Sequence, residues 1–375
     1  MEFVWNEMQT MLKDSARKFC ENEFPPSTVK DTISGASAYD PEIWKKMAEL
    51  GWLGFLFGEQ YGGSDGTFLD MMPILEEMGR VMAPSPFFSS IIMGGLILSE
   101  GADDRLKELY LKKLCQGELI VTPAVLEEEG SWMPSTFLTK ATKMDKNYLL
   151  QGRKLFVADA EDADAVLVVA QSGEDENKSS IFVADPKSPN VTLNPLKTIS
   201  GEKMYEMVFD GVEIPADHLV GEEGKGRDII LNVWPRMVVG LCGKMVGGME
   251  KVLEMTVQYA KERHQFGVPI GTFQVIQHYC VDMLTLLETS RILTYQAADR
   301  ASGEGPCLKH AAMAKASCSD AFIRIVNISH QVHGAIGFTE EHNLHIYSRH
   351  AKAWELMLGS AGDHRQAVAG AVLDE

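Results

Sequence analysis

The chain has 375 residues and a formal net charge of −18 at pH 7, from 35 basic and 53 acidic side chains. This length is typical of two or three domains. With 45% hydrophobic and 23% charged residues, the composition is that of a globular protein and excludes collagen-like and disordered classes. A surface this acidic repels phosphate backbones and anionic lipids, so the charge argues against nucleic-acid and membrane-surface binding.

The cysteines and the apolar segments indicate a reducing compartment. Six cysteines are scattered without a CxxC pair, which argues against a zinc cluster or a disulfide framework. Glu7 and Asp14 interrupt the N-terminal segment, which therefore lacks the pattern of a signal peptide. The longest apolar stretch, residues 87–98, is too short to span a bilayer. We expect a cytoplasmic protein without membrane insertion.

Helical periodicity dominates residues 1–118, which we predict to form a helical domain. Asp40 and Pro41 are typical of an N-cap and a first helical residue, and Gly51 of a helix end. Segments 65–80 and 103–114 carry the same pattern.

The period changes after residue 118. Turn-forming residues separate five β-rich runs, at 149–158, 165–170, 180–184, 191–193 and 204–212. No long helix alternates with these runs, so residues 119–222 are predicted to form an antiparallel sheet domain. Beyond a glycine-rich joint at 221–226, residues 223–375 return to long helical patterns.

Several functional motifs are absent or weak. No GxGxxG follows a strand and there is no GxxxxGK[ST], which excludes the usual dinucleotide and P-loop sites. The histidines at 342, 345 and 350 have a spacing that is only a weak metal signal, and we interpret them as exposed or helix-capping. Residues 127–129, three glutamates, are interpreted as a solvated loop. No metal site is predicted.

One segment combines charge, an aromatic ring and tight turns between two helices. Residues 262–274 have the sequence ERHQFGVPIGTFQ. Its arginine and the backbone N–H groups at the start of the next helix could bind a phosphate. Spacing alone leaves a simple helix–helix corner equally possible.

This segment strongly resembles a signature of the flavin-dependent acyl-CoA dehydrogenases. So do three other blocks, GWLGFLFGEQYGGSDG (51–66), VFDGVEIPADHLVGEEGKG (208–226) and QVHGAIGFTEEHNLHIYSRHAK (331–352). They occur in family order and extend the resemblance over essentially the whole chain. The resemblance implies an N-terminal helical domain, a middle antiparallel β domain and a C-terminal four-helix bundle.

The resemblance also implies FAD as cofactor and assigns residues to it. Arg236, Leu358 and Gly359 match positions that line the acyl-CoA cleft. The implied cofactor contacts are Phe156, Val157 and Ala158 beside the flavin ring, Arg263, Phe266, Phe273 and Gln274 at the pyrophosphate, Gln331, Val332, His333, Gly334 and Ala335 across a dimer interface, and Ser360.

The family's chemistry removes the α-proton of an acyl-CoA with a glutamate while flavin N5 takes a hydride from Cβ. This chain departs from that pattern, because the resemblance places Leu358 at the base position and Pro235 at a known alternative position. Neither side chain accepts a proton. Glu355 and Asp363 are the nearest carboxylates in sequence and are weak candidates.

Three interpretations follow. The chain is a working dehydrogenase with another base and an unusual, branched or cyclic substrate, or a catalytically incomplete subunit of a heteromeric dehydrogenase. In the third, it binds acyl-CoA and flavin for base-free chemistry or as a scaffold. The resemblance further implies a dimer of dimers, with a paralogous subunit in the heteromeric case, and electron-transfer flavoprotein or a similar acceptor.

Overall fold

The computed structural model describes residues 5–35, 39–132, 136–173, 175, 177–303, 305 and 307–373. The chain divides into two compact units, each assembled from separated segments. We call Met1–Asp31, Phe68–Ala83 and Val238–Glu375 the bundle unit, and Thr32–Thr67 and Pro84–Met237 the sheet unit.

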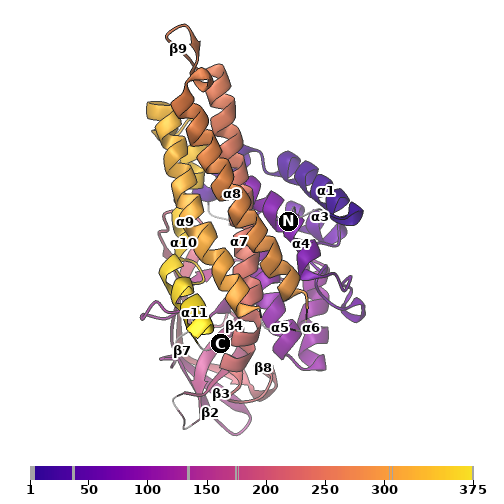
Figure 1. Cartoon of the computed structure of the whole chain (residues 1–375). Coiled ribbons are helices and arrows are strands. Elements are labelled where there is room, and N and C mark those ends of the chain that lie inside the picture. Colours follow the sequence, from indigo (N-terminus) through magenta and orange to yellow (C-terminus); the bar gives the residue numbers. More distant parts are fainter. Residues whose placement is uncertain are drawn as a thin grey trace. The chain divides into compact units, whose positions relative to one another are not determined.

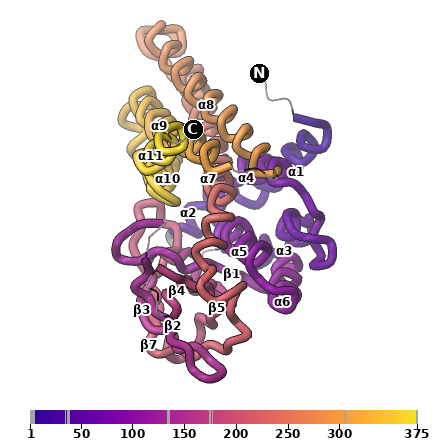
Figure 2. The backbone as a smooth tube through the Cα atoms, turned by 60° about the horizontal axis from the view of Figure 1, so that its bottom comes forward, coloured from indigo at the N-terminus to yellow at the C-terminus, as the bar shows by residue number. Residues whose placement is uncertain are grey.

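Long helices make up most of the bundle unit. Helices α8 and α9 pack against each other, and α10 and α11 pack on α9 (Figures 1 and 2). Helix α1 packs on α4 in the same unit. The elements of the bundle unit are α1 (Glu7–Glu23), α4 (Phe68–Arg80), β9 (His264–Gln265), β10 (Val268–Pro269), η4 (Ile270–Thr272), α8 (Gln274–Ala301), α9 (Leu308–His333), η5 (Gly334–Phe338), α10 (Leu344–Leu356) and α11 (Ala361–Leu373).

The predicted helix boundaries at Asp40 and Asp103 are confirmed. The Asp40 carboxylate accepts a hydrogen bond from Glu42 N at 2.8 Å, and the Asp103 carboxylate accepts one from Leu106 N at 2.8 Å. Both residues are N-caps of helices in the sheet unit. The helical elements assigned wholly or partly to the sheet unit are α2 (Pro26–Ser34), α3 (Pro41–Glu49), η1 (Glu59–Tyr61), a π-helical segment η2 (Phe88–Gly95), α5 (Leu96–Gly101), α6 (Asp104–Cys115), η3 (Ala216–His218) and the first part of α7 (Gly226–Glu262), up to Met237.

The sheet has the strand order β6-β7-β3-β2-β4-β5-β8, with β1 paired to β4. All five predicted runs are strands, but the purely antiparallel arrangement is wrong. Strands β1 and β2 both pair with β4 in parallel, so the sheet is mixed. The strands are β1 (Val121–Ala124), β2 (Lys140–Lys143), β3 (Asn147–Ala158), β4 (Ala165–Ser172), β5 (Ser179–Ala184), β6 (Val191–Leu196), β7 (Met204–Pro215) and β8 (Leu219–Val220).

Helix α7 (Gly226–Glu262) is long and apolar enough to cross a membrane by length and composition. However, 78% of its most apolar window is buried inside the protein. It is therefore a buried core helix, because a helix that is apolar on all sides must bury that surface inside the protein or in a membrane.

Glycines let α4 and α7 approach closely within the bundle unit. A Cβ atom added to Gly79 would lie 2.0 Å from the Lys244 carbonyl oxygen, and one added to Gly247 would lie 1.8 Å from the Glu76 carbonyl oxygen. Neither position accepts a larger residue without separating the backbones.

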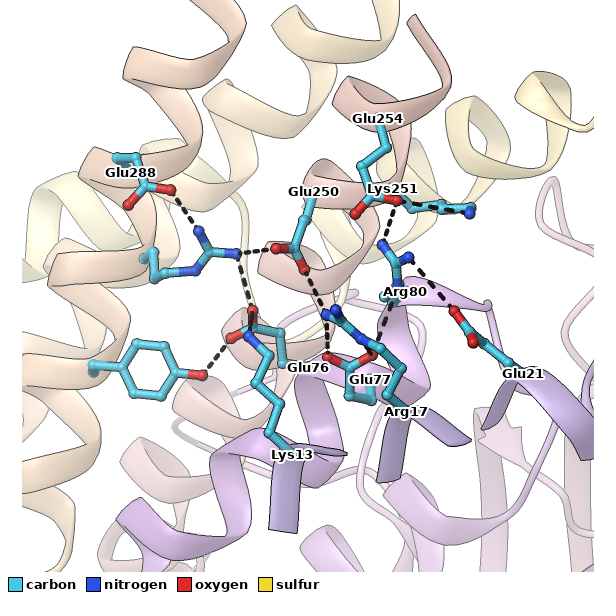
Figure 3. A network of polar contacts seen from close by, with 12 residues as sticks. Lys13, Arg17, Glu21, Glu76, Glu77, Arg80, Glu250, Lys251, Glu254 and Glu288 are labelled. Atoms are coloured by element: carbon cyan, nitrogen blue, oxygen red, sulfur yellow. Dashed lines mark hydrogen bonds and ion pairs between the residues drawn. The ribbon is translucent and has the colours of Figure 1, made fainter. Parts of the chain in front are cut away.

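A network of buried charges lies beside this close approach (Figure 3). The Glu76 carboxylate is fully buried and binds Lys13 at 3.0 Å and Arg291 at 2.9 Å. Tyr295 donates its hydroxyl to the same carboxylate. Burial alone would raise the pKa of Glu76, but Arg291, Lys13 and Tyr295 outweigh it and hold the pKa below its ordinary range. Glu250 on α7 lies 3.2 Å from Arg291, so the network joins α1, α4, α7 and α8 through paired charges.

Candidate functional site

The segment from Arg263 to Gln274 forms a hairpin that projects from the bundle unit. Strands β9 and β10 pair through a two-residue turn of Phe266 (φ 54°) and Gly267 (φ 85°). The Phe266 ring is 92% exposed and makes an edge contact with Phe273 at 6.1 Å between centroids. Arg263 is exposed, and its guanidinium forms no ion pair with any residue that the structure describes. The hairpin thus presents an unpaired cation beside an unburied aromatic ring.

The second predicted cofactor segment packs against the base of this hairpin. Val332 forms one apolar cluster with Ala260 and Ile270, and Phe273 packs on that cluster. The bundle unit therefore brings together two segments that are about 60 residues apart in sequence. Gln331 is exposed and lines a pocket of about 650 Å³ between α8, α9 and α10.

His333, predicted as a cofactor contact, is 4% exposed. Its ring stacks on Tyr259 at 4.5 Å and lies 4.7 Å from the His342 ring. His330 stacks on Phe338 at 4.6 Å. The predicted capping role of His342 is confirmed, since its Nδ1 accepts from Leu344 N at 3.2 Å.

The histidines at 330, 333, 342 and 345 form a cluster whose members all have lowered pKa values. Burial is the largest cause of each lowered pKa. Nearby positive groups, among them Lys30 and Arg349, lower the pKa values further, whereas Glu340 raises that of His345. Among the described residues, no His, Cys, Asp or Glu group is arranged to hold a metal ion. The third histidine of the sequence pattern, His350, is 3% exposed and packs on Trp354, so its interpretation as an exposed residue is wrong.

We expect the bundle unit to lose stability as the pH falls below about 6.5, the ordinary histidine pKa. Below this pH the unfolded chain binds more protons than the folded histidine cluster does, so the free energy of unfolding increases as the pH rises through this range. The His333→Phe variant should show a shallower decrease in urea-unfolding midpoint between pH 7 and pH 5, and the exposed His278→Gln variant should match the unaltered protein. Equal pH dependence in all three proteins would contradict this reading of the cluster.

In the sheet unit, the predicted flavin-ring residues lie on an irregular part of β3. The pairing of β3 with β7 shifts between Lys154 and Val157, which leaves Phe156 in a bulge at φ 51°. The Phe156 ring is 47% exposed, whereas Val157 is 1% exposed. The Ala158 carbonyl accepts a hydrogen bond from Thr122 at 2.7 Å. The bulge directs one aromatic ring of the predicted run outward.

A buried ion pair supports this bulge. The Lys154 ammonium lies 2.7 Å from the Glu127 carboxylate, which also accepts bonds from Leu138 N and Thr139 N. Glu127 is 6% exposed, so its interpretation as part of a solvated loop is wrong. Burial lowers the pKa of Lys154 to about 8 despite this partner.

The predicted catalytic turn follows α10. Leu358 is fully buried and adopts φ 58°, a conformation that costs a non-glycine residue about 1 kcal/mol. Gly359 follows at φ 97°. The buried side chain of Leu358 is aliphatic, so this turn offers only backbone groups for polar chemistry.

The carboxylates of both weak candidate bases already bind neighbouring groups. The Asp363 carboxylate accepts bonds from the N–H and the hydroxyl of Ser360, each at 2.8 Å, and these bonds lower the pKa of Asp363. Glu355 pairs with Lys352 at 2.8 Å. A general base near neutral pH needs the opposite shift, so Asp363 is poorly suited to that role.

Arg236, predicted to line the acyl-CoA cleft, is neutralised within the sheet unit. Glu100 on α5 approaches its guanidinium at 2.7 Å and also accepts a bond from Asn232 at 3.2 Å. Trp234, on the same helix, packs near Trp132 at 6.1 Å between centroids. No sequence pattern pointed to Glu100, because α5 is only six residues long and carries no clear periodicity.

Three family models match the chain in order. They describe the N-terminal domain (residues 6–118), the middle domain (124–212) and the C-terminal domain (224–373) of acyl-CoA dehydrogenase. The chain belongs to the acyl-CoA dehydrogenase family. Its fold is the family fold, with helical, β-sheet and helical domains in sequence order.

Relatives of this chain include dehydrogenases and reductases of acyl-CoA. An acryloyl-CoA reductase (NADH) from Anaerotignum propionicum is 28% identical over 100% of this chain and 96% of its own length. Subunit CarC of the caffeyl-CoA reductase–Etf complex of Acetobacterium woodii is 27% identical over 98% of this chain and 99% of its own length. The solved butyryl-CoA dehydrogenase of Megasphaera elsdenii superposes with a TM-score of 0.94 at 27% identity, covering 100% of both chains.

The acyl-CoA dehydrogenase family is FAD-dependent, and the bundle unit has groups that fit that cofactor. A diphosphate needs a cation, and the Arg263 guanidinium is unpaired among the described residues. An adenine ring needs an aromatic or apolar surface, and Phe266 provides one. The buried Nε2 of His333 also has no partner among the described residues.

Proposed function

We propose that this chain is an FAD-dependent acyl-CoA dehydrogenase that acts at Cα–Cβ of an acyl-CoA thioester. The supporting observation is the hairpin with its unpaired Arg263, built on the same apolar cluster as Val332. A simple helix–helix corner needs neither a free guanidinium nor an exposed phenylalanine. The two segments are those that match the family's cofactor motifs.

In this proposal Arg263 holds the pyrophosphate of FAD through a charge-assisted pair. Phe266, Phe273 and Gln274 would lie beside the pyrophosphate, and the 331–335 segment would contact the cofactor across a dimer interface. Phe156, Val157, Ala158 and Ser360 would lie at the flavin. When bound, FAD supplies the acceptor for the hydride that leaves Cβ. The chain's own contribution to the reaction is to bind the thioester and polarise its carbonyl through the backbone N–H of Leu358.

We further propose that proton removal does not use the side chain at position 358. Leu358 and Pro235 have no proton-accepting group, and Asp363 and Glu355 are engaged by Ser360 and Lys352. A different carboxylate and a branched or cyclic acyl group would complete the reaction. The proposed electron acceptor is electron-transfer flavoprotein, supported by the relative that is a subunit of an Etf complex.

A second candidate function is that of an incomplete subunit in a heteromeric dehydrogenase. The aliphatic, buried Leu358 favours it, because such a chain would supply binding groups while a paralogous partner supplies the base. Base-free chemistry or a scaffold role is the third reading. We propose a dimer of dimers in the cytoplasm for either enzyme form.

The absorbance spectrum of the purified single chain tests the cofactor proposal. A flavin band supports the homomeric enzyme, and a colourless protein supports the incomplete subunit. In the flavin-containing protein, we expect Arg263→Ala to weaken FAD binding roughly ten- to hundredfold, since a charge-assisted pair is lost.

Fluorescence titration of the apoprotein with FAD measures that change. The matched control is Arg300→Ala, which removes an arginine near the opposite end of α8 and should leave FAD affinity unchanged. Full flavin occupancy in Arg263→Ala at dilute FAD would show that the hairpin is not a cofactor clamp.

A further inference from the structure

The turn after α10 is held by side chains from outside it. The Lys315 ammonium donates to the Glu355 and Gly359 carbonyl oxygens, each at 3.0 Å, and so bridges both sides of the turn. The His364 Nε2–H donates to the Leu358 carbonyl oxygen at 2.9 Å. Three carbonyl groups within five residues are therefore fixed by two side chains.

Lys315 is an unusual residue to find in this place. Its side chain is fully buried within α9, and its third hydrogen bond goes to the Ser319 hydroxyl at 3.1 Å. Burial lowers the pKa of Lys315, which reflects the cost of placing an ammonium group there. All three of its N–H donors are used, as a buried cation requires. A buried lysine that lowers stability in this way is expected to have a structural or functional role.

The role of Lys315 is to hold the conformation of the 357–360 turn. Leu358 and Gly359 both have positive φ, and Leu358 carries backbone strain that the surrounding bonds must offset. Asp363 binds the N–H of Ser360, whereas no hydrogen bond from the N–H of Leu358 or Gly359 is formed with any described residue. The turn thus keeps its carbonyl groups occupied and leaves two consecutive N–H groups available.

We propose that Lys315 and His364 are positioning residues, which hold the 357–360 turn so that the Leu358 N–H is free to bind the thioester carbonyl oxygen. This inference rests on the proposed function and deepens it. Charge that develops on the carbonyl oxygen when the α-proton leaves is stabilised by a donor fixed in advance. The side chain at position 358 does not contribute to this backbone hydrogen bond, so the bond can form with leucine at that position.

Ionisation of a bound 3-oxoacyl thioester tests the proposal without any turnover. Acetoacetyl-CoA loses its α-proton to solvent, and the enolate is measured by its ultraviolet absorbance. In the FAD-loaded protein, we expect the apparent pKa of bound acetoacetyl-CoA to lie below that of the free compound. In Lys315→Met and in His364→Leu, we expect the bound enolate fraction at a fixed pH in the titration range to decrease about tenfold.

Lys244→Met is the matched control. Lys244 is also a buried lysine of the bundle unit, and its ammonium lies over the Trp354 ring at 4.6 Å. This variant should keep the pKa of bound acetoacetyl-CoA. Hydrogen exchange of the 357–360 amides should quicken in the first two variants and stay unchanged in Lys244→Met.

The outcomes separate the two proposals. If either folded variant keeps both the acetoacetyl-CoA ionisation and the amide exchange of the unaltered protein, that residue has no positioning role. If Lys315→Met does not fold, His364→Leu alone tests the proposal. If the unaltered protein fails to bind acetoacetyl-CoA, the proposed function is wrong and the inference falls with it. Binding without a shift of its pKa contradicts the Leu358 N–H as a donor while leaving thioester binding intact.

Discussion

Replacing Leu358 by glutamate should raise the rate at which butyryl-CoA reduces the bound flavin by about 100-fold or more. General-base assistance typically contributes about 10²- to 10⁴-fold, and the unaltered chain has no proton acceptor at this position. The site is fully buried, so it would raise the pKa of the new carboxyl group and strengthen it as a base. Anaerobic stopped-flow bleaching of the flavin absorbance measures the rate.

Leu358→Gln is the control for this prediction. Glutamine has the shape and polarity of glutamate but accepts no proton, so its rate should stay within a few-fold of that of the unaltered protein. Equal gains from both variants would assign the effect to packing. No gain from Leu358→Glu, with flavin and thioester bound, would contradict the placement of this turn at the α-carbon.

Replacing Glu76 by glutamine should lower the free energy of unfolding of the bundle unit by about 3 kcal/mol. Removing one partner of a buried ion pair leaves uncompensated charge, which typically costs 3–5 kcal/mol. Lys13 and Arg291 would both lose their carboxylate (Figure 3). Glu250 lies 3.2 Å from Arg291 and compensates in part, which places the expected loss at the lower end. Urea unfolding followed by circular dichroism measures it.

Glu108→Gln serves as the matched control, because Glu108 and Lys112 form an exposed pair at 2.6 Å whose loss should change stability by less than about 1 kcal/mol. The pKa of Glu76 lies below its ordinary value of 4.5. Its contribution is therefore complete above pH 4.5 and is lost as the pH falls through the folded-state pKa. A Glu76→Gln loss no larger than that of Glu108→Gln would contradict the role of the network.

The regular elements were predictable because they depend on local patterns. Asp40, Pro41 and Gly51 mark the limits of a helix that caps and periodicity already indicate. The five β-rich runs became strands for the same reason. The 263–274 segment, for which we propose a cofactor role, carries a sequence signature, whereas its packing with Val332 is visible only in the folded chain.

Features that depend on partners distant in sequence were not predictable. The parallel pairing of β1 and β2 with β4 leaves no trace in a four-residue strand. Glu127 belongs to an acidic run, and its burial follows from Lys154, 27 residues away. Lys315 did carry a signal, since it stands among alanines on a buried helix face. Its acceptors on the 357–360 turn are visible only in the folded chain.

The most direct test of the account mixes the flavin-loaded homomer with butyryl-, octanoyl- and palmitoyl-CoA without oxygen. We propose that the chain retains cofactor and thioester binding but lacks a proton acceptor at position 358. We therefore expect each thioester to bind and the oxidised flavin band to persist, with bleaching at least about 100-fold slower than in Leu358→Glu. Rapid bleaching of the unaltered homomer by any of these straight-chain thioesters would contradict this proposal, because straight-chain substrates would then react efficiently without a proton acceptor at position 358.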